Sequence, residues 1–246
     1  MTDFLSDGSE VERAINNTHK IILSLKNEYH RFLKPRVKAD DYGGYRPTLP
    51  IIPEAHIMFE TTNKKSVRSD LETLLRKKII RQFYVDLPDF PAERFFMMFN
   101  DYIDQFKSVG SQLATDFADK VLDKHLKCII SETELKKFGF NDEKIREMVQ
   151  IHILYITENH SYFIGLPNGT PFTMSVNSGR KEIVSYLKRS PNAKKMSVLS
   201  RNINDSLYYS EFHFKSLLGI GVISLQQARN PLEDKVSLVY DPYTKK

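Results

Sequence analysis

The chain has 246 residues, of which 41% are hydrophobic, so it can build the core of one large domain or of two to three small ones. Its single cysteine, Cys128, excludes intramolecular disulfides and cysteine-rich zinc modules, and no two of its seven histidines stand four residues apart. No stretch approaches the roughly 18–20 uncharged apolar residues of a membrane span, and the acidic N-terminus does not resemble a signal peptide. We therefore expect an intracellular protein that uses no metal or cofactor and inserts into no membrane.

The net charge of +5 is unevenly distributed along the chain. Seven Lys or Arg residues stand against one Glu between Gly179 and Arg201, and seven stand against two acidic residues between Asn63 and Arg81. These windows carry excesses of +6 and +5, so the rest of the chain carries −6. Phosphate binding requires positive charge that is concentrated in this way.

The first third of the chain is predicted to be a tail followed by helices and a hairpin. Residues 1–12 are expected to form a flexible acidic tail, and residues 34–50, with three prolines and two glycines, a loop. Asn63 is a suitable N-cap for one of the helices. The expected elements are helices over residues 11–33, 53–59 and 63–78 and strands over residues 80–87 and 95–99.

The second third repeats this order with clearer signals. Ser131 and Glu134 predict a capping box, and Gly139 predicts the left-handed end of the helix that they begin. Asn141 is the expected N-cap of the next helix. The expected elements are a mostly helical segment over residues 101–126, helices over residues 131–138 and 141–149, and strands over residues 154–157 and 162–164.

The last third is expected to begin with a helix at Ser178 and Gly179. A second helix follows a break at a proline, and a third is stopped by Gly219. The expected elements are helices over residues 178–189, 193–199 and 210–218 and strands over residues 222–226 and 235–240.

One seven-residue pattern occurs three times, each time where a helix gives way to a strand. It consists of an apolar pair, three other residues and a second apolar pair, as in Leu74 to Ile80, and its copies lie 74 and 69 residues apart. This spacing suits a small module with a core of its own. It predicts that the second residue of each copy occupies an equivalent buried position, at Leu75, Val149 and Leu218.

Helices followed by a two-stranded hairpin are typical of the winged helix, a variant of helix-turn-helix. We therefore expect an α+β protein, mainly helical, made of three tandem winged-helix domains. Their expected bounds are residues 13–100, 101–176 and 177–246.

From about Leu49 to Tyr240 the chain resembles the family named after serine/threonine-protein kinase 19. Short matches in the same order carry the resemblance, at Phe138-Gly139-Phe140, Leu154-Tyr155-Ile156, Tyr162-Phe163, Gly179-Arg180, Lys188-Arg189 and Leu217-Leu218-Gly219. It implies tandem winged helices, a nuclear location, DNA binding and a part in the repair of lesions that stall transcription. Members of that family carry a dense Lys/Arg run before the first unit, and only residues 34–38 are similar to it here.

The two basic windows are the expected contacts with nucleic acid. Lys181, Lys188 and Arg189 are predicted on the solvent face of a helix, with few acidic residues at pairing distance along the sequence. Cations without partners favour an external anion, so the third unit is expected to be the principal contact with the phosphates of double-stranded DNA. RNA stays open as a ligand. The expected set is Arg180, Lys181, Lys188, Arg189, Lys194, Lys195 and Arg201, with Lys64, Lys65 and Arg68 at a helix N-terminus in the first unit.

The sequence carries no complete kinase signature. The Gly-x-Gly at residues 219–221 lacks the third glycine of a phosphate-binding loop, and the His-Arg and Asp-Phe pairs lack the residues that complete the kinase motifs. Asp86 and Asp89 flank a proline and are interpreted as a solvated turn. We therefore expect no enzyme, but a DNA-binding protein whose remaining surface contacts proteins of the transcription or repair machinery. The alternatives are a protein-interaction scaffold that binds no DNA and, third, a protein kinase.

Overall fold

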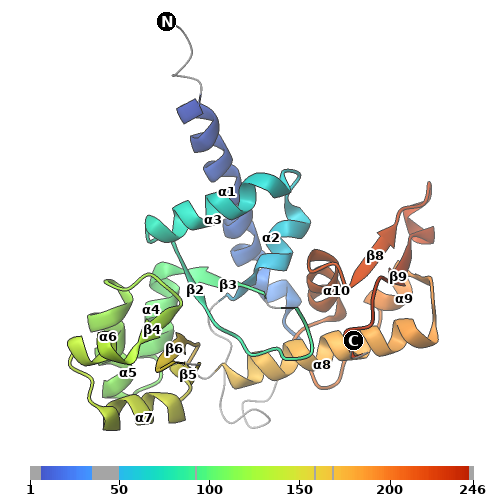
Figure 1. The fold of residues 1–246 in the computed structure, drawn as a ribbon. Helices are drawn as coiled ribbons and strands as arrows, with labels where there is room; N and C mark the ends of the chain where they lie inside the picture. Colours follow the sequence, from blue (N-terminus) through green and yellow to red (C-terminus); the bar gives the residue numbers. More distant parts are fainter. Residues whose placement is uncertain (1–6, 35–49, 92, 158, 168, 244–246) are drawn as a thin grey trace, which may run out of the picture.

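The computed structural model describes residues 7–34, 50–91, 93–157, 159–167 and 169–243 (Figure 1). In this part of the chain the strands form three antiparallel sheets of three strands each. In every sheet the strand that comes last in sequence lies in the middle. Helices and sheets occur together, so the expected α+β class is confirmed.

Three groups of elements follow one another along the chain, and we call them unit 1, unit 2 and unit 3. Each has a leading helical segment, then a strand, two helices and a hairpin. Unit 1 consists of α1 (Asp7–Phe32), β1 (Ile52–Pro53), α2 (Glu54–Glu60), α3 (Lys64–Arg76), β2 (Ile80–Phe83) and β3 (Phe95–Met98). Ile22 and Leu25 of α1 share a hydrophobic core with Val67 and Leu71 of α3, so the two long helices of this unit are packed together.

Unit 2 confirms the helix caps that the sequence predicted. Ser131 and Glu134 form a capping box, and the side chain of Asn141 accepts a hydrogen bond from the Lys144 N–H at 3.0 Å. Gly139 has a φ of 88°. The elements are α4 (Phe99–Lys107), α5 (Gln112–Phe117), the π-helix η2 (Ala118–Leu122), β4 (Ile129–Ser131), α6 (Glu132–Lys137), α7 (Asp142–Gln150), β5 (Leu154–Ile156) and β6 (Ser161–Ile164).

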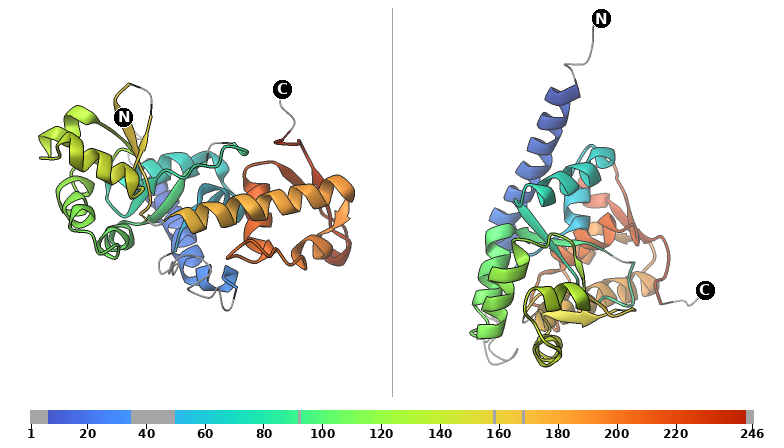
Figure 2. Two further views of the ribbon diagram at one scale, coloured as in Figure 1. Left: turned by 90° about the horizontal axis from the view of Figure 1, so that it is seen from below. Right: turned by 60° about the vertical axis from the view of Figure 1, so that its left-hand side comes forward.

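Unit 3 begins with the long helix α8, which runs along one side of the molecule from unit 2 to unit 3 (Figure 2). Its elements are α8 (Thr170–Arg189), β7 (Ala193–Lys194), α9 (Lys195–Leu199), α10 (Ser210–Gly219), β8 (Ile223–Gln226), the 3-10 turn η3 (Pro231–Glu233) and β9 (Lys235–Leu238). In the described residues, no helix is long and apolar enough to cross a membrane.

Two expected boundaries differ from the structure. Helix α1 already begins at Asp7, so residues 7–12 are not a tail; an acidic composition also suits the first turns of a helix. Helix α8 begins at Thr170, so the expected boundary between residues 176 and 177 falls inside it. Gly179 lies inside α8, whereas the sequence predicted that it marks the start of a helix. A Cβ there would lie 2.1 Å from the Nε2 of His213, so close packing requires the glycine.

The residues predicted to be equivalent do occupy equivalent places. Leu75, Val149 and Leu218 are each the last residue but one of a helix, in α3, α7 and α10. Leu75 is buried, whereas Val149 and Leu218 are half-buried, so the expectation of burial holds only for the first.

These three helices also end in the same way. Three residues further on, φ is positive: 54° at Lys78, 58° at His152 and 76° at Gly221. In each copy the N–H of that residue bonds three residues back and the next N–H bonds five residues back, which is the Schellman motif. The repeated sequence pattern therefore marks a repeated backbone structure.

Unit 1 contacts both of the other units. A Cβ at Gly219 of α10 would lie 2.1 Å from the carbonyl oxygen of Ala55 in α2, so the backbones of these helices are in direct contact. On the other side, the N–H of Tyr84 donates to the carbonyl of Ile164 at 3.0 Å, which joins the end of β2 to the end of β6. The three units thus form one continuous body.

Candidate nucleic-acid interface

The outer face of α3 carries three cations that the sequence predicted as phosphate contacts. Helix α3 lies across α1 at the surface, with Val67 and Leu71 turned towards α1 (Figure 1). The periodicity that buries these residues leaves Lys64, Lys65 and Arg68 exposed. Asn63 is the N-cap residue, but its side chain makes no capping hydrogen bond.

The cations on α3 have few acidic neighbours. Lys64 and Lys65 form no ion pair with a described residue, and the side chain of Arg68, which is 79% exposed, lies 4.0 Å from Glu54. Arg94 binds that same carboxylate through two nitrogens at 2.9 Å and also binds Glu72 at 2.7 Å. The hydrogen bonds that Arg94 donates to Glu54 raise the pKa of Arg94, and a guanidinium stays charged in such a network. Arg94 therefore offsets part of the negative charge of Glu54 and Glu72, as one cation between two carboxylates.

The positive surface continues from α3 into unit 2. Lys78 pairs with Asp123 at 2.6 Å, and the Nη2 of Arg81 donates to the carbonyl of Lys127 at 3.1 Å. These contacts place the segment after η2 beside the end of α3. Both segments carry exposed cations, and we call this set the α3 basic face: Lys64, Lys65, Arg68, Arg76, Lys77, Lys124 and Lys127.

Arg180 does not belong to the predicted set of phosphate contacts. Its side chain is fully buried, and its Nη2 contacts Glu93 and the Oγ of Ser216. Its guanidinium also lies 5.3 Å from the centre of the Phe90 ring. The expectation of a solvent-facing Arg180 is wrong because this side of α8 packs against unit 1.

The other cations between Gly179 and Arg201, except Arg189, have acidic partners that the sequence did not reveal. Most of these partners come from distant parts of the chain. The pairs are Lys181–Asp89 at 2.7 Å, Lys188–Asp241 at 2.6 Å, Lys194–Glu233 at 2.9 Å, Lys195–Asp234 at 3.9 Å and Arg201–Glu182 at 2.6 Å. Exposed ion pairs contribute only about 0–1 kcal/mol each, but they offset the charge that a phosphate would meet. Arg189 is exposed and donates only to the Ser185 carbonyl at 3.2 Å.

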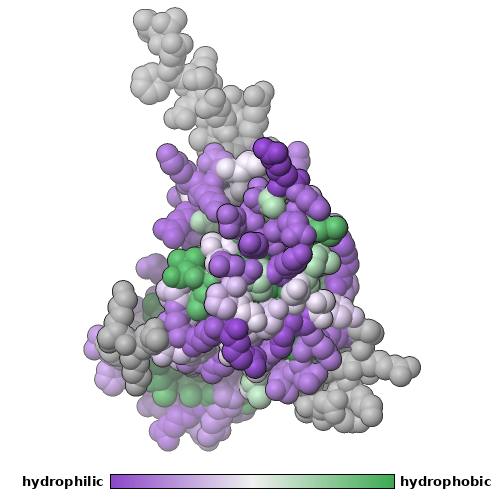
Figure 3. All heavy atoms as spheres, turned by 90° about the vertical axis from the view of Figure 1, so that its right-hand side faces the viewer, coloured by the Kyte–Doolittle hydropathy of each residue, from purple (hydrophilic) through white to green (hydrophobic). Residues whose placement is uncertain are grey.

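Among the three equivalent helices, α3 offers the most accessible positive charge. Helix α10 is buried by α2 and α8, with Phe212, His213 and Phe214 all inaccessible. Helix α7 is exposed but begins with Asp142 and Glu143. Unit 3, on the right in Figure 1, presents a mostly hydrophilic face with separate hydrophobic spots (Figure 3).

Two histidines are buried where unit 1 meets unit 3. His56 Nε2 lies 2.9 Å from the Phe212 carbonyl, and His213 Nε2 lies 2.7 Å from the Oγ of Ser206. Burial lowers the pKa of His56 to about 3 and holds the pKa of His213 well below its usual value. His213 is therefore a buried structural residue.

The surroundings of the aromatic side chains near α10 and of the single cysteine indicate structural roles for most of them. Tyr208 and Phe212 are core residues, whereas Tyr209 is 44% exposed. Burial raises the pKa of the half-buried Cys128 thiol to about 11, which does not suit a reactive cysteine. Within the described ranges, no three His, Cys, Asp or Glu side chains come together as a possible metal site.

Sequence reasoning missed four members of the α3 basic face. Arg76 and Lys77 lie inside the first basic window, and their exposure could have been inferred from the helical period. Lys124 and Lys127 carried no such signal, because only the fold brings their segment beside α3.

Comparison with known protein families gives no match for this chain. Over 180 residues the chain is 27% identical to a protein named serine/threonine-protein kinase mug51 from Schizosaccharomyces pombe. The match covers 66% of this chain and 58% of that protein, so the chain spans less than two thirds of its relative.

The relative's name contradicts the expectation that this chain is not an enzyme. That expectation depended on missing motifs of the common protein-kinase fold. The absence of these motifs argues only against the common protein-kinase fold. It does not test phosphate transfer by a protein of a different fold. The expectation is therefore corrected.

Proposed function

We propose that the chain binds double-stranded DNA through the phosphate backbone and that its principal contact is the α3 basic face. The observation that carries the proposal is the group of exposed cations at Lys64, Lys65 and Arg68. The two lysines form no ion pair with a described residue, and the carboxylate beside Arg68, on Glu54, is already held by Arg94. Phosphate contacts of this kind supply most of the affinity of DNA-binding proteins. Arg189 and the paired lysines of unit 3 are secondary contacts.

We further propose that each unit is a winged helix. The repeated order of strand, two helices and hairpin supports this assignment, as does the common ending of α3, α7 and α10. In a winged helix the second of these helices is the one that enters the DNA groove. Helix α3 holds that position in unit 1 and is exposed.

The resemblance to the serine/threonine-protein kinase 19 family supports a nuclear role in the repair of lesions that stall transcription. Proteins of the transcription or repair machinery are then the expected partners of the remaining surface.

The test is the affinity of the full chain for a duplex oligonucleotide, measured by fluorescence anisotropy over a series of salt concentrations. Each phosphate contact contributes about −0.9 to the slope of log K against log salt. We expect a steep slope and similar affinities for unrelated sequences. Binding that does not depend on salt, or no binding at low salt, would contradict the proposal and favour a protein-interaction scaffold.

The name of the yeast relative supports a second candidate, the transfer of phosphate from ATP to serine or threonine. Its test is incubation of the purified chain with labelled ATP, Mg²⁺ and a mixed protein substrate. Transfer that copurifies with the folded chain would establish this activity. If the chain neither transfers phosphate nor binds nucleotide, this second candidate function is ruled out.

A further inference from the structure

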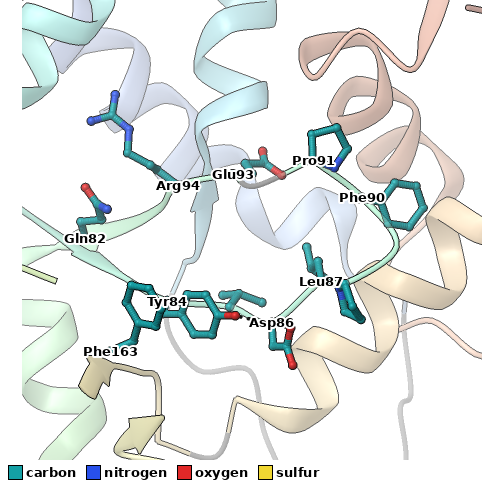
Figure 4. A pocket seen from close by; sticks show the side chains of 11 residues that line it. Gln82, Tyr84, Asp86, Leu87, Phe90, Pro91, Glu93, Arg94 and Phe163 are labelled. Carbon is teal, nitrogen blue, oxygen red and sulfur yellow. Dashed lines mark hydrogen bonds between the residues drawn. The ribbon is translucent and has the colours of Figure 1, made fainter. Parts of the chain in front are cut away.

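A groove of about 350 Å³ lies inside the loop that connects β2 to β3, on the side of unit 1 that faces unit 2 (Figure 4). The chain enters at Gln82 and returns at Arg94, so its side chains surround the groove. Gln82, Tyr84 and Asp86 line the groove at alternate positions of the chain. In Figure 4 the Gln82 side chain is directed towards Arg94, whereas the Asp86 carboxylate lies beside the Tyr84 hydroxyl at the outer edge of the loop. Unit 2 contributes Phe163.

Aromatic rings form one wall of this groove. The ring of Tyr84 is stacked on that of Phe163, with centroids 4.4 Å apart and planes 8° apart, and Tyr155 meets Tyr84 edge-on at 5.6 Å. Tyr155, Phe163 and Ile129 are paired across the sheet of unit 2 and therefore lie on the same face of it. Ile129 is 45% exposed, which extends the apolar surface beyond the groove.

Among the described residues that line the groove, one charged side chain forms no ion pair, and it is negative. Asp86 is exposed and forms no ion pair with a described residue, and the hydroxyl of Tyr84 donates to it at 3.4 Å. The neighbouring charges are already paired, as Glu93–Arg180, Asp89–Lys181 and Arg94 with Glu54 and Glu72. In the last of these groups, the single cation of Arg94 faces the two carboxylates of Glu54 and Glu72. A cationic ligand is therefore favoured and a phosphate is repelled.

We propose that this groove binds an arginine side chain of a partner protein. A guanidinium can lie flat on the Tyr84 ring while its fork donates two hydrogen bonds to the Asp86 carboxylate, which the ammonium of lysine cannot do. Arginine anchors in partly desolvated pockets are common energetic centres of protein interfaces. The inference is independent of DNA binding, because the groove and the α3 basic face share no cation.

The experiment is a titration of the full chain with two short peptides, followed by NMR of its backbone amides. The peptides differ only in a central residue, arginine in one and citrulline in the other, since citrulline keeps the shape of arginine and loses its charge. We expect the arginine peptide to shift the amide signals of Tyr84, Asp86 and Phe163. The citrulline peptide should bind at least about tenfold more weakly, which is the effect of removing one charge-assisted hydrogen bond.

Two variants separate the groove from general charge effects. Asp86→Asn should weaken binding of the arginine peptide at least about tenfold, because it keeps the shape and removes the charge. Asp104→Asn, which also changes an exposed aspartate without an ion pair to a described residue, should leave binding unchanged. The proposal is overturned if neither peptide shifts these signals, if the two peptides bind equally, or if the two variants behave alike. It is also overturned if oligothymidylate, tested in parallel, occupies the groove and the arginine peptide does not.

Discussion

Arg180 of α8 and Glu93 of unit 1 form an ion pair in which both side chains are removed from water, exposed by 0% and 2%. The second carboxylate oxygen of Glu93 accepts the N–H of Ala55 at 3.0 Å, so the pair also holds the start of α2. The Nε and Nη1 of Arg180 have no hydrogen-bond partner among the described residues. The pair connects unit 1 to unit 3, so water can reach the two charges only if the units separate.

Removing one charge of this pair should destabilise the fold strongly. Glu93→Gln keeps the size of the side chain but leaves a buried guanidinium without a counter-ion, for which we expect a loss of about 3–5 kcal/mol. Urea denaturation followed by circular dichroism measures it. Lys181→Ala is the control, because it breaks an exposed ion pair and should cost at most about 1 kcal/mol. Equal losses in the two variants would show that the buried pair has no special role.

The stability of the protein should fall as the pH drops from neutral to about 5. The folded state keeps His56 neutral with a pKa of about 3, whereas in the unfolded chain the imidazole binds a proton near its usual pKa of about 6.5. The unfolded state therefore binds more protons below pH 6.5, which by linkage costs about 2 kcal/mol at pH 5 from this residue alone. His213 acts in the same direction.

The test compares urea denaturation at pH 7 and pH 5 for the unmodified chain and for the double variant His56→Gln, His213→Gln. The double variant should lose less stability than the unmodified chain over this interval. If both lose the same amount, other groups control the acid sensitivity and the buried histidines do not.

The position of Gly221, after α10, should require glycine because of its left-handed backbone conformation and not because space is short. A Cβ at Gly221 would meet nothing within 4 Å, but φ is 76°. Gly221→Ala should therefore cost about 1 kcal/mol from backbone strain alone. Gly221→Asn should cost less, because asparagine tolerates this conformation better than alanine. Thermal unfolding of the two variants measures the difference, and a larger loss for asparagine would argue against backbone strain as the cause.

The sequence was informative where local chemistry determines structure. The caps at Ser131 and Asn141 and the equivalence of Leu75, Val149 and Leu218 depend on neighbouring residues, and they were predicted correctly. Helix periodicity could also identify the exposed Lys64, Lys65 and Arg68.

The sequence failed where the outcome depends on distant residues. Arg180 looked like a surface cation because Glu93, its partner, stands 87 residues away. Lys181 and Lys188 likewise acquire Asp89 and Asp241 only through folding. A search for acidic residues one helical turn away cannot find such partners, so the sequence overestimates the unpaired positive charge between Gly179 and Arg201.

The central claim is that the α3 basic face is the principal DNA contact, and a matched pair of charge reversals tests it most directly. One variant carries Lys64→Glu, Lys65→Glu and Arg68→Glu. The other carries Lys137→Glu, Lys144→Glu and Arg146→Glu in unit 2, where these side chains are also exposed and form no ion pair with a described residue. Both variants change the net charge equally and keep the same composition.

The measurement is the dissociation constant for duplex DNA, by fluorescence anisotropy at several salt concentrations, with circular dichroism to confirm folding. We expect the α3 variant to bind at least about tenfold more weakly, with a salt slope reduced by about 0.9 for each phosphate that the variant no longer binds. The unit 2 variant should change much less. Equal weakening in both would show that only net charge matters, and an unchanged α3 variant would contradict the account.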